Sequence, residues 1–186
     1  MRIVNRYLPA EPAPKARPWC FSIIRRVLLA VTAALLLFAG SPASAQSLRQ
    51  GIAAFDGRNY AVASRIFIPL ARRGNASAQT YLGFLFETGR GVPQNYPEAA
   101  IWYRCAAEQG DSLAQYSLGL LYDKGQGVPL DVVEAAKWLN LAAASAPPRA
   151  RESRARIRDA IATKMTRDEI AQSQYRALAW TPVRAR

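Results

Sequence analysis

Two stretches of this chain repeat one another. Residues 76–109 read ASAQTYLGFLFETGRGVPQNYPEAAIWYRCAAEQ, and residues 112–145 read SLAQYSLGLLYDKGQGVPLDVVEAAKWLNLAAAS. Aligned at an offset of 36 residues, the two stretches share 15 identities in 34 pairs. A period of this length is typical of helical solenoids, in which each unit buries its apolar face against the next. The repeat therefore predicts an all-α chain.

Each repeat is expected to contain two antiparallel helices. The first begins after an N-cap residue, Asn75 or Asp111, and ends at Gly89 or Gly125, where a left-handed residue is expected. Its core stripe contains Ala78, Leu82, Leu85 and Phe86.

The second helix of each repeat has its own start signal. Asn95 and Asp131 are each followed three residues later by a glutamate, Glu98 and Glu134, which is the spacing of a capping box. The residues that define the repeat are Leu82, Gly83, Gly89, Gly91 and Trp102, with Leu118, Gly119, Gly125, Gly127 and Trp138 in the second copy.

These two copies closely resemble the Sel1-like repeat, a branch of the tetratricopeptide-like helical hairpins. The resemblance spans residues 47–145 if a degenerate first hairpin at 47–74 is included before the repeats at 75–110 and 111–146. It implies a right-handed α-solenoid of about two and a half to three hairpins that binds other proteins and is not an enzyme. The cysteine pairs that some members of this family carry are not present in these repeats.

The N-terminal residues 1–45 have the three parts of a secretory signal peptide. A basic region precedes the apolar residues 27–38, and Ala43 and Ala45 form the small-residue pattern that signal peptidase recognises, so cleavage is expected after Ala45. We therefore expect an exported bacterial protein, either periplasmic or secreted. The alternative is an uncleaved inner-membrane anchor, which would bury Arg25 and Arg26 at an unfavourable cost.

A basic segment of residues 147–186 follows the repeats. From residue 149 onward it holds ten Lys or Arg against four Asp or Glu, a net charge of +6. Ile157, Ile161 and Met165 recur at a spacing of four, and Thr166 with Glu169 forms a capping box, so two further helices are expected to cap the solenoid.

The arginines of this segment have two interpretations. They could hold an anionic envelope lipid or polymer, or they could simply make the face of the cap soluble. At helical spacing they surround the helix, which favours the second interpretation, and no nucleic-acid partner is expected. The arginines in question are Arg149, Arg151, Arg154, Arg156 and Arg158.

The composition excludes most familiar catalytic chemistry. The chain has no histidine, so Ser-His and Cys-His nucleophile pairs and imidazole metal sites are impossible. Residues 110–113 read GDSL, an esterase signature whose serine would have no His base, and Gly110 with Asp111 fits a helix junction. Cys105 is expected to be a packing residue. No enzyme activity, cofactor or metal is expected.

The function expected from these observations is an exported scaffold that binds a protein or peptide on the concave surface lined by the first helices. Opposite the core stripe, these helices present aromatic and apolar residues beside carboxylates, which suits an extended peptide with a positive charge. Burial of Phe84 and Leu120 between neighbouring hairpins is an equally open interpretation. The candidate partner-binding residues are Thr80, Phe84, Glu87, Tyr116, Leu120 and Asp123.

Overall fold

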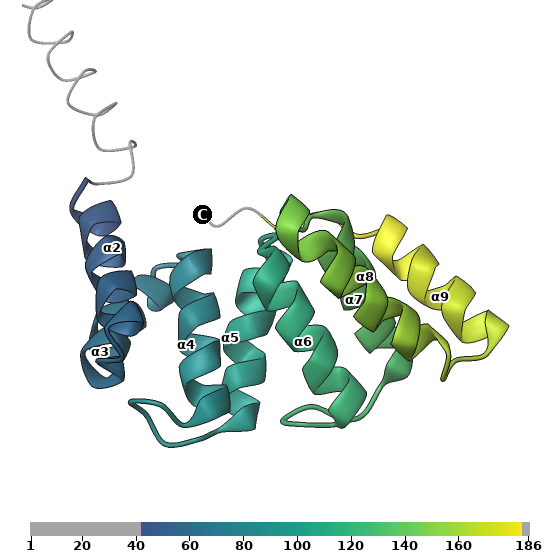
Figure 1. The fold of residues 1–186 in the computed structure, drawn as a ribbon, viewed down its shortest axis with the longest axis horizontal. Helices are drawn as coiled ribbons and strands as arrows, with labels where there is room; N and C mark the ends of the chain where they lie inside the picture. Colours follow the sequence, from purple (N-terminus) through teal and green to yellow (C-terminus); the bar gives the residue numbers. More distant parts are fainter. Residues whose placement is uncertain (1–41, 184–186) are drawn as a thin grey trace, which may run out of the picture. The chain divides into compact units, whose positions relative to one another are not determined.

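The computed structural model describes residues 42–183, and all the regular structure in that range is helical (Figure 1). The helices are α2 (Pro42–Asp56), α3 (Tyr60–Arg72), α4 (Ala76–Thr88), α5 (Tyr96–Glu108), α6 (Ser112–Lys124), α7 (Val132–Ala144), α8 (Pro148–Ala162) and α9 (Arg167–Leu178). Within residues 42–183, no helix has the length and hydropathy needed to cross a membrane.

The residues that the structure describes include only the end of the predicted signal peptide, from residue 42 to residue 45. Its apolar part, residues 27–38, lies outside them. Helix α2 begins at Pro42, so the expected cleavage point after Ala45 falls within the first turn of that helix.

The helices pack as tandem hairpins. Each of the pairs α2 with α3, α4 with α5 and α6 with α7 packs together, and each second helix also packs against the first helix of the next pair. The first helices α4 and α6 contact one another as well. The predicted α-solenoid is confirmed, and Figure 1 shows the successive hairpins from α2 to α7.

The predicted starts and ends of the first helices are confirmed. The Asn75 side chain accepts a hydrogen bond from the Ala78 amide at 2.9 Å, and Asp111 caps α6 in the same way. Gly89 and Gly125 have left-handed φ angles of 68° and 64°. Local capping and the repeat period therefore specify the same helix boundaries.

The second glycine of the GxGVP turn has a separate role. Gly91 has a φ of 72°, and a Cβ there would collide with the carbonyl of Tyr60, at the start of the second helix of the preceding hairpin. Gly127 stands in the same relation to Tyr96. Each of these turns joins the two helices of one hairpin and packs against the preceding hairpin, so a side chain at either position would push two hairpins apart.

The core is divided among the hairpins. The first cluster is centred on Phe67 and Leu82, and the second on Tyr103 and Leu118. A smaller third cluster holds Ala136, Leu139 and Ile161. The solenoid therefore has a chain of small cores, each shared by adjacent helices.

Buried glutamines connect consecutive hairpins. Gln79 Nε2 donates to the Ala71 carbonyl at 3.0 Å, and Gln115 Nε2 donates to the Ala107 carbonyl at 3.2 Å. In both cases the first helix of one hairpin adds a second donor to a carbonyl at the end of the preceding helix, which also accepts from the amide of Gly74 or Gly110 at 3.0 Å.

The start signals of the later helices are only partly as predicted. Asn95 accepts a hydrogen bond from the Glu98 amide, and Asp131 caps α7, but the Glu134 carboxylate binds Lys137 and Arg176 instead of returning to the cap. The full capping box predicted at Thr166 and Glu169 is confirmed at the start of α9.

Two C-terminal helices complete the stack, as predicted. Helix α8 begins at Pro148, directly after Pro147, and both α8 and α9 pack against α7. Beyond α9, the Trp180 ring meets the Trp138 ring edge-on at 6.3 Å, and the Val183 amide donates to the Glu108 carbonyl at 2.7 Å. The end of the described chain therefore runs back along the second helices.

Both interpretations of Arg154 from the sequence, as a ligand for an anionic surface and as part of a soluble face, are wrong because the residue is buried. Its guanidinium is buried, with Nη1 donating to the Ser112 carbonyl at 3.0 Å and the Ala142 carbonyl at 3.3 Å. The group also lies 5.6 Å from the centre of the Tyr116 ring. Burial lowers the pKa of Arg154 from its ordinary value. This arginine joins α8 to the repeats and is not available to an anionic surface.

Candidate partner-binding groove

An apolar cleft of about 280 Å³ lies on the side of the molecule formed by the first helices. We call it the first-helix groove. Its lining comes from α2, α4, α5 and α6 and consists of Phe55, Thr80, Tyr81, Phe84, Tyr103, Leu113 and Ser117. Leu113 is half exposed, although it is a large apolar residue on a well-formed helix. The groove therefore leaves apolar surface open to solvent.

Aromatic rings form one wall of the groove. The Phe55 ring meets the rings of Tyr60, Tyr81 and Phe84 edge-on, with centroid distances of 5.4, 4.9 and 5.4 Å. Tyr81 also stacks on Phe67, which is fully buried, at 4.9 Å. Rings held by several neighbours lose little conformational freedom when a ligand binds, which favours binding.

The base of the groove contains a hydrogen-bonded tyrosine. The Tyr103 hydroxyl donates to Glu87 Oε2 at 2.7 Å. Burial, and then the charge of Glu87, raise the pKa of Tyr103 well above its usual value. Tyr103 therefore stays protonated, and it holds the Glu87 carboxylate near the groove.

The surroundings of Tyr81 are negatively charged. Burial raises the pKa of Tyr81, and the carboxylates of Asp56 and Asp111 raise it further. Asp111 is the N-cap of α6, whereas Asp56 is exposed at the C-terminal end of α2. Together with Glu87, which binds Tyr103, these two residues place three carboxylates around the groove.

The structure places the three candidate residues of the first repeat at the groove. Thr80 and Phe84 line it, and Glu87 contacts it through Tyr103. The Thr80 side chain is buried, however, and its hydroxyl donates to the Ala76 carbonyl at 3.0 Å. Phe84 is half-buried, so its side chain both packs against neighbouring residues and remains partly open to solvent.

Two of the three candidates of the second repeat, Tyr116 and Asp123, contact the C-terminal cap. Tyr116 packs against the third core cluster, and Asp123 accepts an ion pair from Lys164 at 3.1 Å. Leu120 is half-buried in α6. None of these three residues lines the first-helix groove, to which α6 contributes Leu113 and Ser117 instead.

The sequence reasoning missed Phe55, Tyr81, Tyr103, Leu113 and Ser117. A signal for two of them exists, because Tyr81 and Ser117 are 36 residues apart and occupy equivalent positions. The exposed face of α4 differs from the one expected. Gln79 and Gly83 were not included in the predicted core stripe, but both are buried. Gln79 is buried at the junction with α3. The open face of α4 therefore includes Tyr81, which lines the groove.

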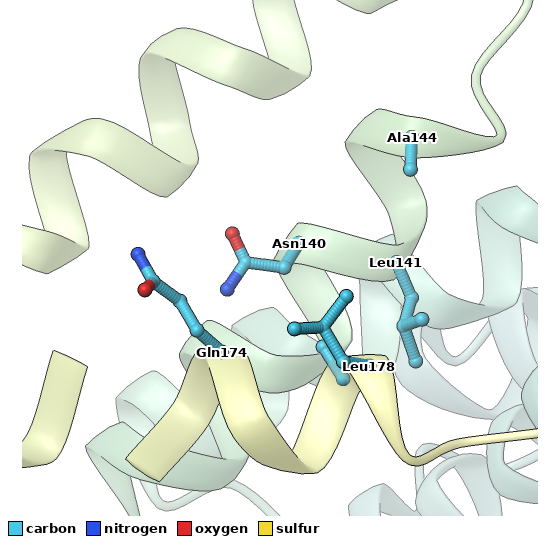
Figure 2. A pocket seen from close by; sticks show the side chains of 6 residues that line it. Asn140, Leu141, Ala144, Gln174 and Leu178 are labelled. Atoms are coloured by element: carbon cyan, nitrogen blue, oxygen red, sulfur yellow. The ribbon is translucent and has the colours of Figure 1, made fainter. Parts of the chain in front are cut away.

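A second apolar cleft, of about 370 Å³, lies between α7 and α9 (Figure 2). The amides of Asn140 and Gln174 lie near one another at one end, and Leu141 and Leu178 lie at the other. Leu178 is 86% exposed. Here the lining carries no charged residue.

The motifs that suggested chemistry serve structural purposes. Within the GDSL stretch, Asp111 caps α6 through two backbone amides and Ser112 is the first residue of that helix. Burial raises the pKa of the half-buried Cys105 thiol, so its reactive thiolate is disfavoured at neutral pH. In residues 42–183, no group of three or more Cys, Asp or Glu side chains is arranged to hold a metal ion.

The remaining arginines of α8 differ in how much charge they offer. Arg156 pairs with Glu152, and Arg158 pairs with Asp159 at 2.7 Å. Arg149 and Arg151 are exposed near the start of the helix. The paired acids reduce the positive charge that α8 presents to an anionic surface.

Comparison with known proteins gives a family assignment for the repeats. The family model of the Sel1 repeat matches residues 76–111 and 112–146. No curated protein matches the chain.

The solved structures that resemble it include the following two. A protective antigen of uropathogenic Escherichia coli strains that displays an SLR fold is 29% identical with a TM-score of 0.68, and the match covers 76% of this chain and 30% of that one. A Sel1 repeat protein from Oxalobacter formigenes is 32% identical with a TM-score of 0.56, and the match covers 73% and 55% of the two chains. This chain thus spans about a third and about half of the two proteins.

Proposed function

We propose that this chain, which contains two Sel1 repeats, is a non-catalytic scaffold, exported to the cell envelope, that binds a protein or peptide segment in the first-helix groove. Sel1-repeat proteins are commonly scaffolds for protein interaction, and their repeats are typically non-catalytic. The partner, the groove as its site and the export of the chain are our own additions.

The observation that carries this proposal is the open apolar groove itself. Leu113 is 50% exposed beside an aromatic wall, in a cleft that spans the first helices of consecutive hairpins. Partly open aromatic pockets on rigid elements are the typical sites of binding hot spots. A segment of a partner that runs across α2, α4 and α6 would cover this surface.

The test is a crosslinking pull-down from envelope fractions with the full chain and two variants. Leu113→Ser removes the apolar side chain from the groove without adding a charge, and we expect recovery of the partner to fall about tenfold because the apolar contact is lost. The matched control is Ile101→Ser, because Ile101 is 53% exposed on α5 and does not line the groove. Equal recovery with both variants would contradict the proposal.

Export is tested separately. The apolar residues 27–38 and the small residues at 43 and 45 support cleavage by signal peptidase. N-terminal sequencing of the protein from the envelope fraction should begin at Gln46. A start upstream of the apolar segment would instead show a retained membrane anchor.

The alternative function is electrostatic binding of anionic lipid or polymer by α8. Burial of Arg154 and the ion pairs of Arg156 and Arg158 weaken it, and only Arg149 and Arg151 support it. It predicts envelope binding that is lost at high salt and that depends on the residues after Ala146. The groove proposal predicts binding that is retained in the full-length double variant Arg149→Gln, Arg151→Gln.

A further inference from the structure

Carboxylates lie on the α2 and α6 sides of the first-helix groove, at Asp56 and Asp111. On the α6 side, Asp111 also interacts with the Arg154 guanidinium, which donates to the neighbouring Ser112 carbonyl. Asp56 is exposed, and within residues 42–183 it forms no ion pair. A carboxylate is unfavourable at the C-terminal end of a helix, which is where Asp56 stands. Its position is therefore not explained by the stability of α2, and it adds to the negative charge near Tyr81.

The groove's own aromatic wall already holds a guanidinium at its edge. Arg90 lies 5.3 Å from the centre of the Tyr60 ring and 5.6 Å from that of Phe84, and its Nη1 donates to the Tyr60 hydroxyl at 3.2 Å. Guanidinium groups are attracted to aromatic faces at such distances. Arg90 lies over Phe84, which lines the groove, but the described residues that line the groove include no Arg or Lys.

The sequence predicted a positively charged partner, and the structure supports the same charge through a partly different set of carboxylates. The expectation of a positively charged peptide rested on Glu87 and Asp123. The structure pairs Asp123 with Lys164 and instead brings Asp56 and Asp111 close to Tyr81. Glu87 remains at the groove through Tyr103.

We propose that the first-helix groove selects an arginine or lysine side chain of an extended partner segment. Its aliphatic part would pack against Leu113 and the aromatic wall, and its charge would lie among the carboxylates of Asp56, Glu87 and Asp111. This inference rests on the proposed function, since it names the chemistry that the same groove recognises. The partner is therefore a protein with an exposed basic residue between apolar neighbours.

The test uses a displayed library of random nine-residue peptides, selected on the full chain and counter-selected on Leu113→Ser, a variant that adds no charge to the groove. We expect Arg or Lys to be enriched about tenfold over the input at one position of the peptides that depend on Leu113. A synthetic peptide from this set is then compared with its citrulline or acetyl-lysine version. Loss of the charge should weaken binding to the full chain about tenfold.

Two further variants assign this effect to the groove. In Asp56→Asn the preference for the charged peptide should shrink severalfold, because one of the three carboxylates is neutral. In Asp168→Asn, which changes an exposed carboxylate on α9, the preference should stay unchanged. A preference that Asp56→Asn leaves intact would contradict the role of this carboxylate and overturn the inference as stated.

The selection separates failure of the inference from failure of the proposed function. Peptides that depend on Leu113 but show no basic residue would overturn the inference and leave the groove as a binding site. If no recovered peptide depends on Leu113, both the inference and the proposed site fail.

Discussion

The junctions between repeats and the junction with the C-terminal cap are built differently. Between repeats, Gln79 and Gln115 each donate to one carbonyl of the preceding helix, those of Ala71 and Ala107. At the cap, the buried Arg154 donates to two carbonyls on two different helices. The side-chain donor is a neutral amide at the junctions between repeats and a guanidinium at the junction with the cap.

The arginine does not simply replace the glutamine. The residue 36 positions after Gln115 is Arg151, which is exposed and contacts the Ala146 carbonyl at 3.5 Å. Arg154 lies about one turn later and reaches α6 through Ser112 and α7 through Ala142. The cap thus leaves the register of the repeats, and a single side chain ties α8 to both helices of the last hairpin.

The largest effect is expected from breaking the cap junction. Arg154→Ala removes a charge-assisted donor from two carbonyls, and we expect the free energy of unfolding to fall by about 2–4 kcal/mol. Denaturant unfolding of the full chain measures this. Arg156→Ala, at an exposed arginine of the same helix, should change the value by less than about 0.5 kcal/mol. Similar losses in the two variants would contradict the tether.

A smaller effect is expected at an inner junction. Gln115→Ala leaves the Ala107 carbonyl without its side-chain donor, and the expected loss is about 1–2 kcal/mol because the lost bond is neutral. The same unfolding experiment compares it with Arg154→Ala. If Gln115→Ala proved the more damaging variant, the distinction between neutral and charged junctions would be wrong.

A double-mutant cycle sharpens the account of the inner junctions. Gln109 Nε2 donates to Gln79 Oε1 at 2.7 Å, which links α5 to α4 beside the Ala71 contact. The single variants Gln79→Ala and Gln109→Ala, with the double variant, should give a coupling energy of about 0.5–1 kcal/mol. Strict additivity would mean that this bond contributes nothing to the junction.

The smallest effect is expected at the surface of the cap. Lys164 pairs with Asp123 across the same region, but its side chain is 58% exposed. Lys164→Ala should therefore change stability by at most about 0.5 kcal/mol. A loss comparable to that of Arg154→Ala in denaturant unfolding would assign the tether to the surface pair instead.

The sequence predicted most of the repeat architecture because each signal is local. The caps at Asn75 and Asp111, the left-handed Gly89 and Gly125 and the capping box at Thr166 all follow from residue type and spacing. The offset of 36 residues then places the hairpins in register.

The burial of Arg154 could not be predicted in the same way. Its partners are backbone carbonyls, which every residue possesses and which no side-chain pattern reveals. The candidate site was displaced for a related reason, because Gln79 looks like a surface residue until its bond to the Ala71 carbonyl is known. Because Gln79 is buried, the open face of α4 includes Tyr81, which the sequence pattern did not indicate.

The central claim, that the first-helix groove binds a partner protein, is tested most directly by photocrosslinking in living cells. A photoreactive amino acid is placed at Leu113 in one variant of the full chain and at Ile101 in another, two helix positions of similar exposure. The account predicts one specific protein adduct from position 113 that is absent from position 101. Identical adducts from both positions, or none from position 113, would contradict it.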